Sequence, residues 1–150
     1  YCSWEKRDST LISREEFEKD LLANYELMNQ AGIAYTDAPY FVPPYEHYNA
    51  EIASWAKSMG IQLINFTPGS GTNADYTTPE MKNYKSSETI YKQVLSKEKE
   101  KGLNGYIILI HLGTDDKRTD KFYQNGMRKM ISKLRKEGYV FTGLAEALNR

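Results

Sequence analysis

The sequence predicts an α/β fold in which parallel strands alternate with helices. One observation is Tyr106–Ile110, an unbroken apolar and aromatic run flanked by glycines, which is typical of a strand buried on both faces. A second is the alternation of helical and strand-like patterns along the chain, because it favours parallel strands with right-handed crossovers. The 150 residues are predicted to form a single domain over 1–150.

Capping residues and apolar spacing predict the helices. Ser13 and Glu16 form a capping box that begins a helix over about 14–30, and Gly32 ends it. Asn49 is the predicted N-cap of a second helix, which stops at Gly60. The remaining helices are predicted over about 88–101 after Ser86 or Ser87, over about 120–137 after Thr119, and as a last turn at 144–148.

Short apolar runs bounded by turn residues predict the strands. They are Ile33–Tyr35, Tyr40–Val42, Ile61–Phe66, Tyr106–Ile110 and Tyr139–Phe141. The longest irregular stretch runs from Thr67 to about Tyr84, a length that is usual for functional or mobile loops. No strand pattern precedes the first helix, so we expect the chain to lack an N-terminal part of its domain.

The composition of the chain excludes several classes of function and several kinds of site. The 20 basic and 20 acidic residues balance, so the chain has no basic footprint for nucleic acid. No apolar run is long enough to span a membrane. The single cysteine, Cys2, excludes an internal disulfide and a cysteine-rich zinc site. The two histidines cannot form a closed metal site alone, so no metal ligands are predicted within this chain.

Three loops that follow predicted strands contain the candidate catalytic groups. His111 stands at the end of a buried strand, where an imidazole suits general acid or base work, although hydrogen bonding at a sheet edge explains it equally well. Pro43-Pro44 stiffens the backbone and fixes the direction of the Tyr45 amide, as an oxyanion site requires; an ordinary proline turn is the alternative.

The third loop contains Asp75-Tyr76, where a carboxylate is able to orient a histidine while the ring covers a substrate. The simpler interpretation of the same residues is that they form an Asx turn with no catalytic role. The charged side chains that follow His111 are interpreted as helix-start charges beside Thr119. They are Asp115, Asp116, Arg118 and Asp120.

Taken together, these loops resemble the second half of a NodB-type polysaccharide deacetylase, carbohydrate esterase family 4. Ile107–His111 is similar to the family's Ile-x-Leu-x-His strand end, and Val42–Glu46 with Asn49 is similar to its Arg-x-Pro-Tyr-Gly motif and following Asn. The resemblance implies a distorted (β/α) barrel that hydrolyses acetyl groups from a polysaccharide with a divalent metal, zinc or similar.

The resemblance also implies roles for individual residues. His111 would be the general acid, Asp75 would orient it, and the backbone N–H of Tyr45 would donate to the oxyanion. Substrate contacts would come from Pro44, Glu46 and Tyr76. The family's substrates imply a location outside the cytoplasm, in the periplasm, at the cell surface or secreted.

The sequence departs from the family pattern in two ways. Val42 stands at the motif's arginine and Glu46 at its glycine. The family's Asp-Asp pair and His-x-x-x-His metal motif would lie upstream of Tyr1, so this chain alone is expected to be inactive. We expect it to associate with the missing N-terminal half of the domain or with itself.

Two other functions are compatible with the same residues. A non-catalytic carbohydrate-binding domain with a degenerate deacetylase fold is favoured somewhat by the loss of the motif arginine at Val42. A glycosidase would use Glu46 and Asp75 as its pair of carboxylates, although the sequence does not set their separation.

Overall fold

A computed structural model describes residues 1–6 and 8–148, which form two compact units, Tyr1–Asn65 and Phe66–Arg150. Each unit is described by itself. The chain combines helices with a parallel pair of short strands, which agrees with a mixed helix and strand class. The single domain and the (β/α) barrel stay predictions.

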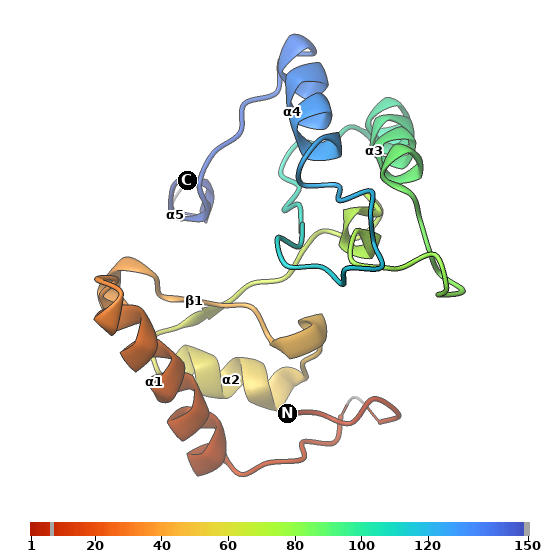
Figure 1. Cartoon of the computed structure of the whole chain (residues 1–150). Helices are drawn as coiled ribbons and strands as arrows, with labels where there is room; N and C mark the ends of the chain where they lie inside the picture. The colour runs from red at the N-terminus through yellow and green to blue at the C-terminus, as the bar shows by residue number, and fades with distance from the viewer. Residues whose placement is uncertain (7, 149–150) are drawn as a thin grey trace. The chain divides into compact units, whose positions relative to one another are not determined.

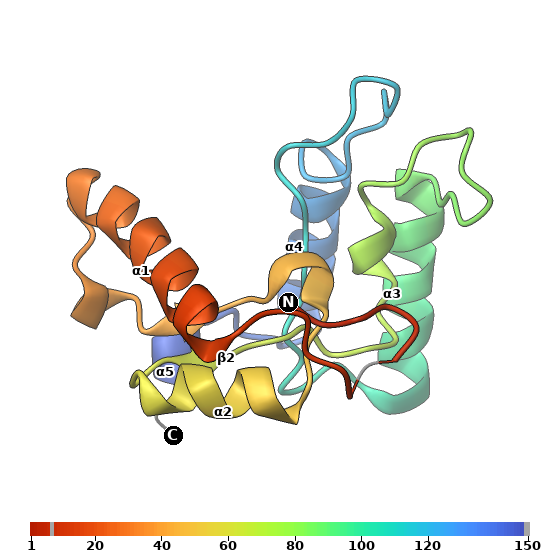
Figure 2. The same ribbon diagram turned by 90° about the horizontal axis from the view of Figure 1, so that it is seen from below.

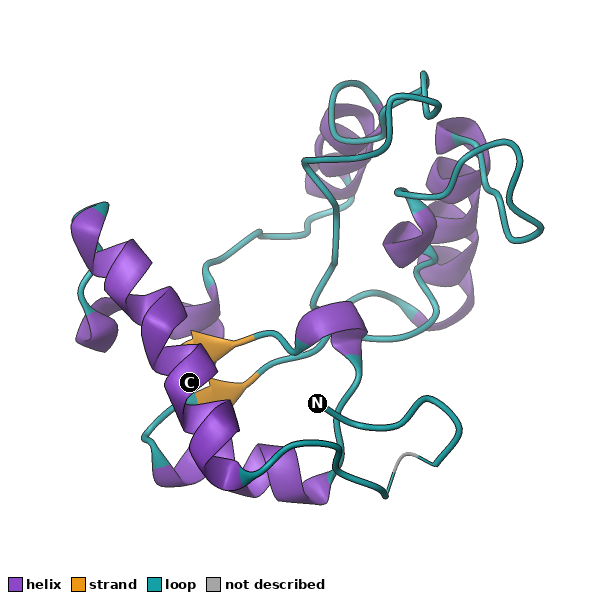
Figure 3. Cartoon of the chain, turned by 60° about the horizontal axis from the view of Figure 1, so that its bottom comes forward, coloured by secondary structure: helices purple, strands orange, loops and turns teal. Residues whose placement is uncertain are grey.

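The first unit packs two helices against the strand pair. Helix α1 spans Arg14–Gln30 and α2 spans Ala50–Ser58, while β1 (Tyr40–Phe41) pairs in parallel with β2 (Gln62–Leu63). Figure 3 shows the two strands side by side next to these helices. Short 3-10 turns occur at Tyr35–Asp37 (η1) and Pro44–Glu46 (η2). The buried apolar core consists of Cys2, Phe17, Leu21, Tyr25, Phe41, Ile52, Ala56 and Ile61.

The predicted start of α1 is confirmed in atomic detail. The Glu16 N–H donates to the Ser13 hydroxyl at 3.2 Å, and the Ser13 N–H donates to the Glu16 carboxylate at 2.7 Å. The Ser13 N–H, and after it the Ser13 hydroxyl, lower the pKa of Glu16, because both donate to its carboxylate and stabilise the charged form. Asn49 likewise caps α2, since its side-chain oxygen accepts from the Ile52 N–H at 2.9 Å.

The buried phenols of this unit predict a loss of stability in alkali. Tyr25 donates its hydroxyl to the carbonyl oxygen of Ala38 at 2.8 Å, and Tyr35 donates to that of Met59 at 2.7 Å. Burial raises the pKa of both groups above the ordinary 10.0, and their mutual repulsion raises the pKa of Tyr25 further. Above that pH the unfolded chain loses protons that the folded chain keeps, so the free energy of unfolding falls as pH rises.

Urea denaturation at a series of pH values measures this slope. Tyr25→Phe should be less stable at neutral pH by about 1 kcal/mol, because the Ala38 carbonyl loses one of its two donors, and should show a shallower alkaline decline. A wild-type chain whose stability stays level well above pH 10 would contradict the prediction.

The second unit is built around two helices. Helix α3 spans Ser87–Lys101 and α4 spans Gly126–Lys136, and they run side by side in Figures 1 and 2. A 3-10 turn, η3, covers Thr72–Ala74, and α5 covers Leu144–Leu148. The buried apolar core contains Ile90, Val94, Leu103, Phe122, Met130 and Leu134.

Two predicted elements of this unit differ from the structure. Tyr106–Ile110 is not a strand buried on both faces: its residues are half-buried, and the ladder-like hydrogen bonds join Ile107 to Thr67 alone. A strand needs a neighbour along its length, which the described residues do not provide here. Helix α4 begins at Gly126 rather than near residue 120: the chain is irregular from Thr119 to Lys121, and residues 122–125 form turns.

Three further sequence predictions have clear outcomes. Ile33–Tyr35 is not a strand, because the 3-10 turn η1 starts at Tyr35, and Tyr139–Phe141 is likewise outside any strand. Helix α3 begins after Ser86, as predicted, with the Ser86 hydroxyl accepting from the Thr89 N–H at 3.2 Å. Within the described residues, no helix combines the length and apolar character needed to cross a bilayer.

Candidate active site

The loop that contains Asp75 is ordered by buried polar side chains. Gly71 adopts a φ of +76°, and a side chain there would collide with Gln93, whose nearest atom lies 2.4 Å from the Cβ position. The Thr72 side chain is fully buried, and its hydroxyl lies 3.0 Å from that of Ser70. The Asp75 N–H then donates to the Thr72 carbonyl at 3.0 Å, which places Asp75 directly after η3.

The structure brings Asp75 and His111 together. His111 Nδ1 lies 2.6 Å from Asp75 Oδ1, and the His111 backbone N–H donates to Asp75 Oδ2 at 2.9 Å. The Asp75 side chain is 1% exposed and the His111 side chain is 29% exposed. One buried carboxylate therefore holds both the backbone and the ring of a histidine that still reaches solvent.

This arrangement determines which ring nitrogen is available. A carboxylate only accepts hydrogen bonds, so Nδ1 of His111 carries the proton directed at Asp75. Nε2 is then the nitrogen that remains to exchange a proton with a ligand. The Tyr76 ring lies 5.1 Å from the imidazole, centroid to centroid, at 60°, and its side chain is partly exposed beside the candidate acid.

A buried arginine forms hydrogen bonds to the loop that follows Asp75. Arg118 is fully buried, and its Nη1 donates to the carbonyl oxygens of Thr77 at 2.6 Å and Lys85 at 3.1 Å. Its Nη2 lies 3.6 Å from Asp120 Oδ1. The interpretation of Arg118 and Asp120 as helix-start charges beside Thr119 is therefore wrong, because the helix begins only at Gly126 and the guanidinium is enclosed. Sequence reasoning missed this role, since an arginine within a charged run carries no signal of burial.

The Tyr45 loop belongs to the first unit and is a tight, strained turn. Tyr45 and Glu46 have φ values of +58° and +54°, in the left-handed region that disfavours residues with a side chain. The turn is closed by the Glu46 N–H donating to Pro43 at 2.9 Å, and Asn65 Nδ2 donates to the Glu46 carbonyl at 3.0 Å. These two hydrogen bonds hold the turn, and the fixed direction of the Tyr45 amide stays a prediction.

The side chains of this loop are mostly open to solvent. Pro44 and Tyr45 are exposed, Glu46 is half-buried, and Val42, at the motif's arginine position, is 49% exposed. These residues lie in the first unit, whereas the Asp75–His111 pair lies in the second. The meeting of Tyr45 with His111 that the resemblance implies stays a prediction.

Metal-ligating residues do not gather in the described part of the chain. Residues 1–6 and 8–148 contain no group of three or more His, Cys, Asp or Glu side chains placed to hold an ion. The residues of the candidate site also do not fit a metal, because His111 Nδ1 and both Asp75 oxygens are occupied by each other.

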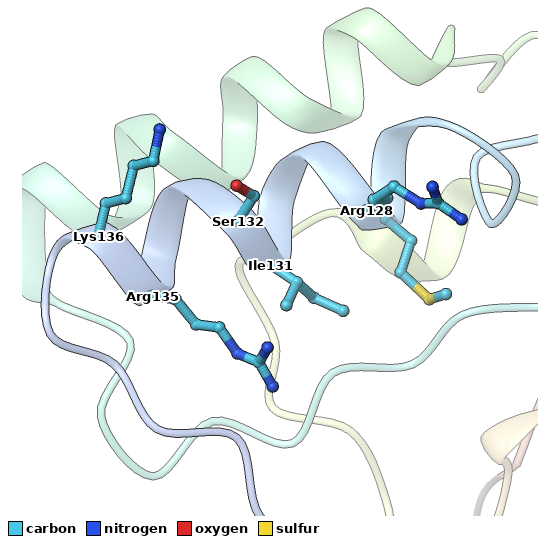
Figure 4. Close-up of a pocket in the computed structure, with 6 residues that line it drawn as sticks. Arg128, Ile131, Ser132, Arg135 and Lys136 are labelled. Atoms are coloured by element: carbon cyan, nitrogen blue, oxygen red, sulfur yellow. The ribbon is translucent and has the colours of Figure 1, made fainter.

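A pocket of about 570 Å³ lies elsewhere, along α4 (Figure 4). Ile131 and Arg135 project to the same side of the helix in that view. Its lining residues are Met127, Arg128, Ile131, Ser132, Arg135 and Lys136. None of them is a predicted site residue, and none is an acid–base group that titrates near neutral pH. The candidate active site is therefore the Asp75–His111 pair rather than this pocket.

Comparison with known proteins finds no family model that matches the chain and no curated protein that matches it. The functional assignment consequently depends on the residues and geometry described above.

Proposed function

We propose that this chain supplies the proton-donating side of a metal-dependent polysaccharide deacetylase. The observation that carries the proposal is the Asp75–His111 pair, in which a buried carboxylate makes two hydrogen bonds to one half-exposed histidine. A histidine that serves only to fill a sheet edge does not need a buried carboxylate dedicated to it. A histidine that must become charged during a reaction needs such a carboxylate, because the carboxylate orients the ring and stabilises the imidazolium.

The chemistry that this pair performs is proton delivery to a leaving group. Water adds to the acetyl carbonyl carbon, and the bond from that carbon to the sugar nitrogen or oxygen then breaks. His111, protonated at Nε2, gives that proton to the departing atom, so that a free amine or hydroxyl forms beside acetate. The Tyr45 backbone N–H is the proposed donor to the oxyanion, and Pro44, Glu46 and Tyr76 are the proposed substrate contacts.

The remaining parts of the mechanism are proposed to lie outside this chain. A divalent metal, zinc or similar, would supply an activated water when bound. Its ligands and the catalytic base would come from the N-terminal half of the domain, with which this chain would associate. Acetylated polysaccharides occur in cell walls and at cell surfaces, so an extracytoplasmic location is part of the proposal.

Acetate release tests the proposal directly. The protein encoded by the complete gene is incubated with acetylated chitin or xylan oligosaccharides, and acetate is measured before and after removal of metal by a chelator. We expect release that stops on chelation and returns with added zinc. Oligosaccharide binding without acetate release, with metal present, would contradict the enzyme and support a non-catalytic carbohydrate-binding domain, which the loss of the motif arginine at Val42 favours.

The glycosidase alternative is less well supported by the site. Its acid and nucleophile need two carboxylates that face the sugar. Asp75 is 1% exposed and both of its oxygens accept hydrogen bonds from His111, so it has no free oxygen directed at a substrate. Cleavage of a glycosidic bond in the same oligosaccharides, seen as shorter products, would reverse this preference.

A further inference from the structure

Two exposed aromatic side chains, Trp4 and Tyr45, lie together in the first unit, and of Tyr45 only the backbone N–H has a role in the proposed mechanism. The Trp4 ring stacks on His47 with ring centroids 4.6 Å apart and planes 20° from parallel. The Tyr45 ring meets Trp4 edge-on at 5.8 Å. Trp4 is 67% exposed and Tyr45 is 79% exposed, whereas His47 is buried beneath them. We call Trp4, Tyr45 and His47 the aromatic platform.

The platform is held rigidly although it faces solvent. His47 Nε2 donates to the Ser3 carbonyl oxygen at 2.8 Å, which ties the Trp4 segment to the turn after η2. The Ser3 hydroxyl accepts from the N–H groups of Glu5 and Lys6 at 3.3 and 3.1 Å. Cys2, on the other side, is buried in the core of the unit. The backbone on either side of Trp4 is therefore held, and the indole itself contacts the rings of His47 and Tyr45, which lowers the cost of ordering it when a ligand binds.

The backbone of the turn favours the same interpretation. Two successive residues with side chains, Tyr45 and Glu46, adopt left-handed conformations, each at a cost of order 1 kcal/mol. Burial of the Tyr45 ring does not offset this cost, because the ring remains exposed. Backbone strain that is not offset by packing is typical of positions where the exposed side chain contacts a ligand.

We propose that the aromatic platform is a sugar-binding subsite, on which one pyranose ring of the glycan stacks against the open face of Trp4. A pyranose presents a flat patch of C–H groups that matches one indole in area, and its hydroxyls point outward to water or polar side chains. Glu5, Lys6 and Glu46 adjoin the platform residues in sequence and are available as such polar groups. The inference rests on the proposed function for its ligand class.

A glycan fits this surface better than a protein partner does. Protein interfaces bury about 800 Å² on each side, with an apolar centre. The platform has two exposed rings, and charged residues stand next to both of them in the sequence. Its size and its mixture of aromatic and polar groups correspond to a single sugar ring.

Intrinsic fluorescence tests the subsite. The chain has two tryptophans: Trp4 is 67% exposed, whereas Trp55 is partly buried against the core, with its ring 5.8 Å from that of Phe17. A change in emission that Trp4→Leu abolishes is therefore assigned to Trp4. Chitin and xylan oligosaccharides, acetylated and deacetylated, are titrated to about 1 mM, where weak binding of a few kcal/mol is detectable. We expect a saturable change in wild-type emission and in calorimetric heat, with at least about tenfold weaker binding in Trp4→Leu.

Two further variants make the test specific. Trp4→Tyr keeps an aromatic face and should recover most of the calorimetric affinity, which a general loss of folding would not allow. Leu11→Ala removes another highly exposed apolar side chain of the N-terminal segment and should leave the affinity unchanged. Equal affinities for wild type and Trp4→Leu, no binding by any of these sugars, or a change in oligomeric state on mutating Trp4 without sugar binding would each overturn the subsite.

The outcome is separable from that of the deacetylase proposal. Trp4-dependent binding by a complete protein that releases no acetate would support the subsite and reject the enzyme. Acetate release that is insensitive to Trp4, with equal affinities in the variants, would support the enzyme and reject the subsite.

Discussion

Replacing His111 by alanine is expected to lower the rate of acetate release by the complete, metal-loaded protein by at least about 100-fold. The reason is that the only nitrogen of the pair left free to deliver a proton is Nε2 of this ring, since Nδ1 donates to Asp75 at 2.6 Å. The KM for oligosaccharide should change little, because a general acid acts in the transition state more than in substrate binding.

Asp75→Asn provides the matched test of orientation. An amide is nearly the same size as the carboxylate, but it presents one acceptor and one donor group in place of two acceptors. The amide can donate only to an unprotonated Nδ1, so it holds the other tautomer of the ring and no longer stabilises the imidazolium. We therefore expect a loss of similar order to that of His111→Ala and little further loss in the double variant. Lys117→Ala, which removes an exposed ion pair with Glu80 in the same unit, is the control.

The pH dependence of the rate distinguishes the acid role from a structural one. If His111 acts as the general acid, the wild-type rate falls as pH rises and the imidazolium is lost, and the residual rate of His111→Ala lacks that limb. Full turnover in His111→Ala, or an unchanged alkaline limb, would remove the residue from the mechanism.

Replacing Arg118 by alanine is expected to destabilise the second unit by about 3–5 kcal/mol, the usual cost of removing one member of a buried charged network. Its guanidinium bonds the carbonyl oxygens of Thr77 and Lys85, which lie on the loop between the Asp75 segment and α3. Nη2 also donates to the Ser87 hydroxyl at 3.3 Å. Without the guanidinium the buried Thr77 carbonyl and the half-buried Lys85 carbonyl lose this donor, and a cavity remains.

Asp120 completes this network and would be left without its cation. It accepts from the Ser87 N–H at 2.7 Å and from the Tyr84 hydroxyl at 3.3 Å, and Arg118 lies over the Tyr84 ring at 5.6 Å. Burial, and then the charge of Asp120, raise the pKa of Tyr84, so this phenol remains a donor at neutral pH. Truncating Arg118 therefore affects the packing at the start of α3 as well as the loop.

Urea denaturation measures the Arg118 effect. The midpoint should fall in Arg118→Ala with the slope unchanged. Arg118→Lys should be intermediate, because an ammonium keeps the charge but not the planar fork that reaches two carbonyls. Arg128→Ala, an exposed arginine on α4, is the control and should cost less than about 0.5 kcal/mol. Equal midpoints for Arg118→Ala and Arg128→Ala would show that the network is dispensable.

Local sequence signals determined the helices whose ends are capped by neighbours in the chain. The Ser13–Glu16 box, the Asn49 cap and the Ser86 cap act within one turn, so α1, α2 and the start of α3 follow from the sequence. The strands depend on partners that are distant in the sequence. Consequently only short parts of two predicted strands, around Tyr40 and Gln62, pair as a sheet.

The candidate site shows the same difference between what local sequence signals reveal and what depends on long-range contacts. A histidine after an apolar run and a carboxylate in a long loop were visible in the sequence, and only the family resemblance paired them. Only the tertiary structure placed Asp75, 36 residues earlier in the chain, within 2.6 Å of His111. It alone showed that Arg118 is buried and that Trp4 stacks on His47, because burial and ring contacts arise from chain segments far apart in sequence. The sequence thus determined which groups are available for chemistry, and long-range packing decided which of them work together.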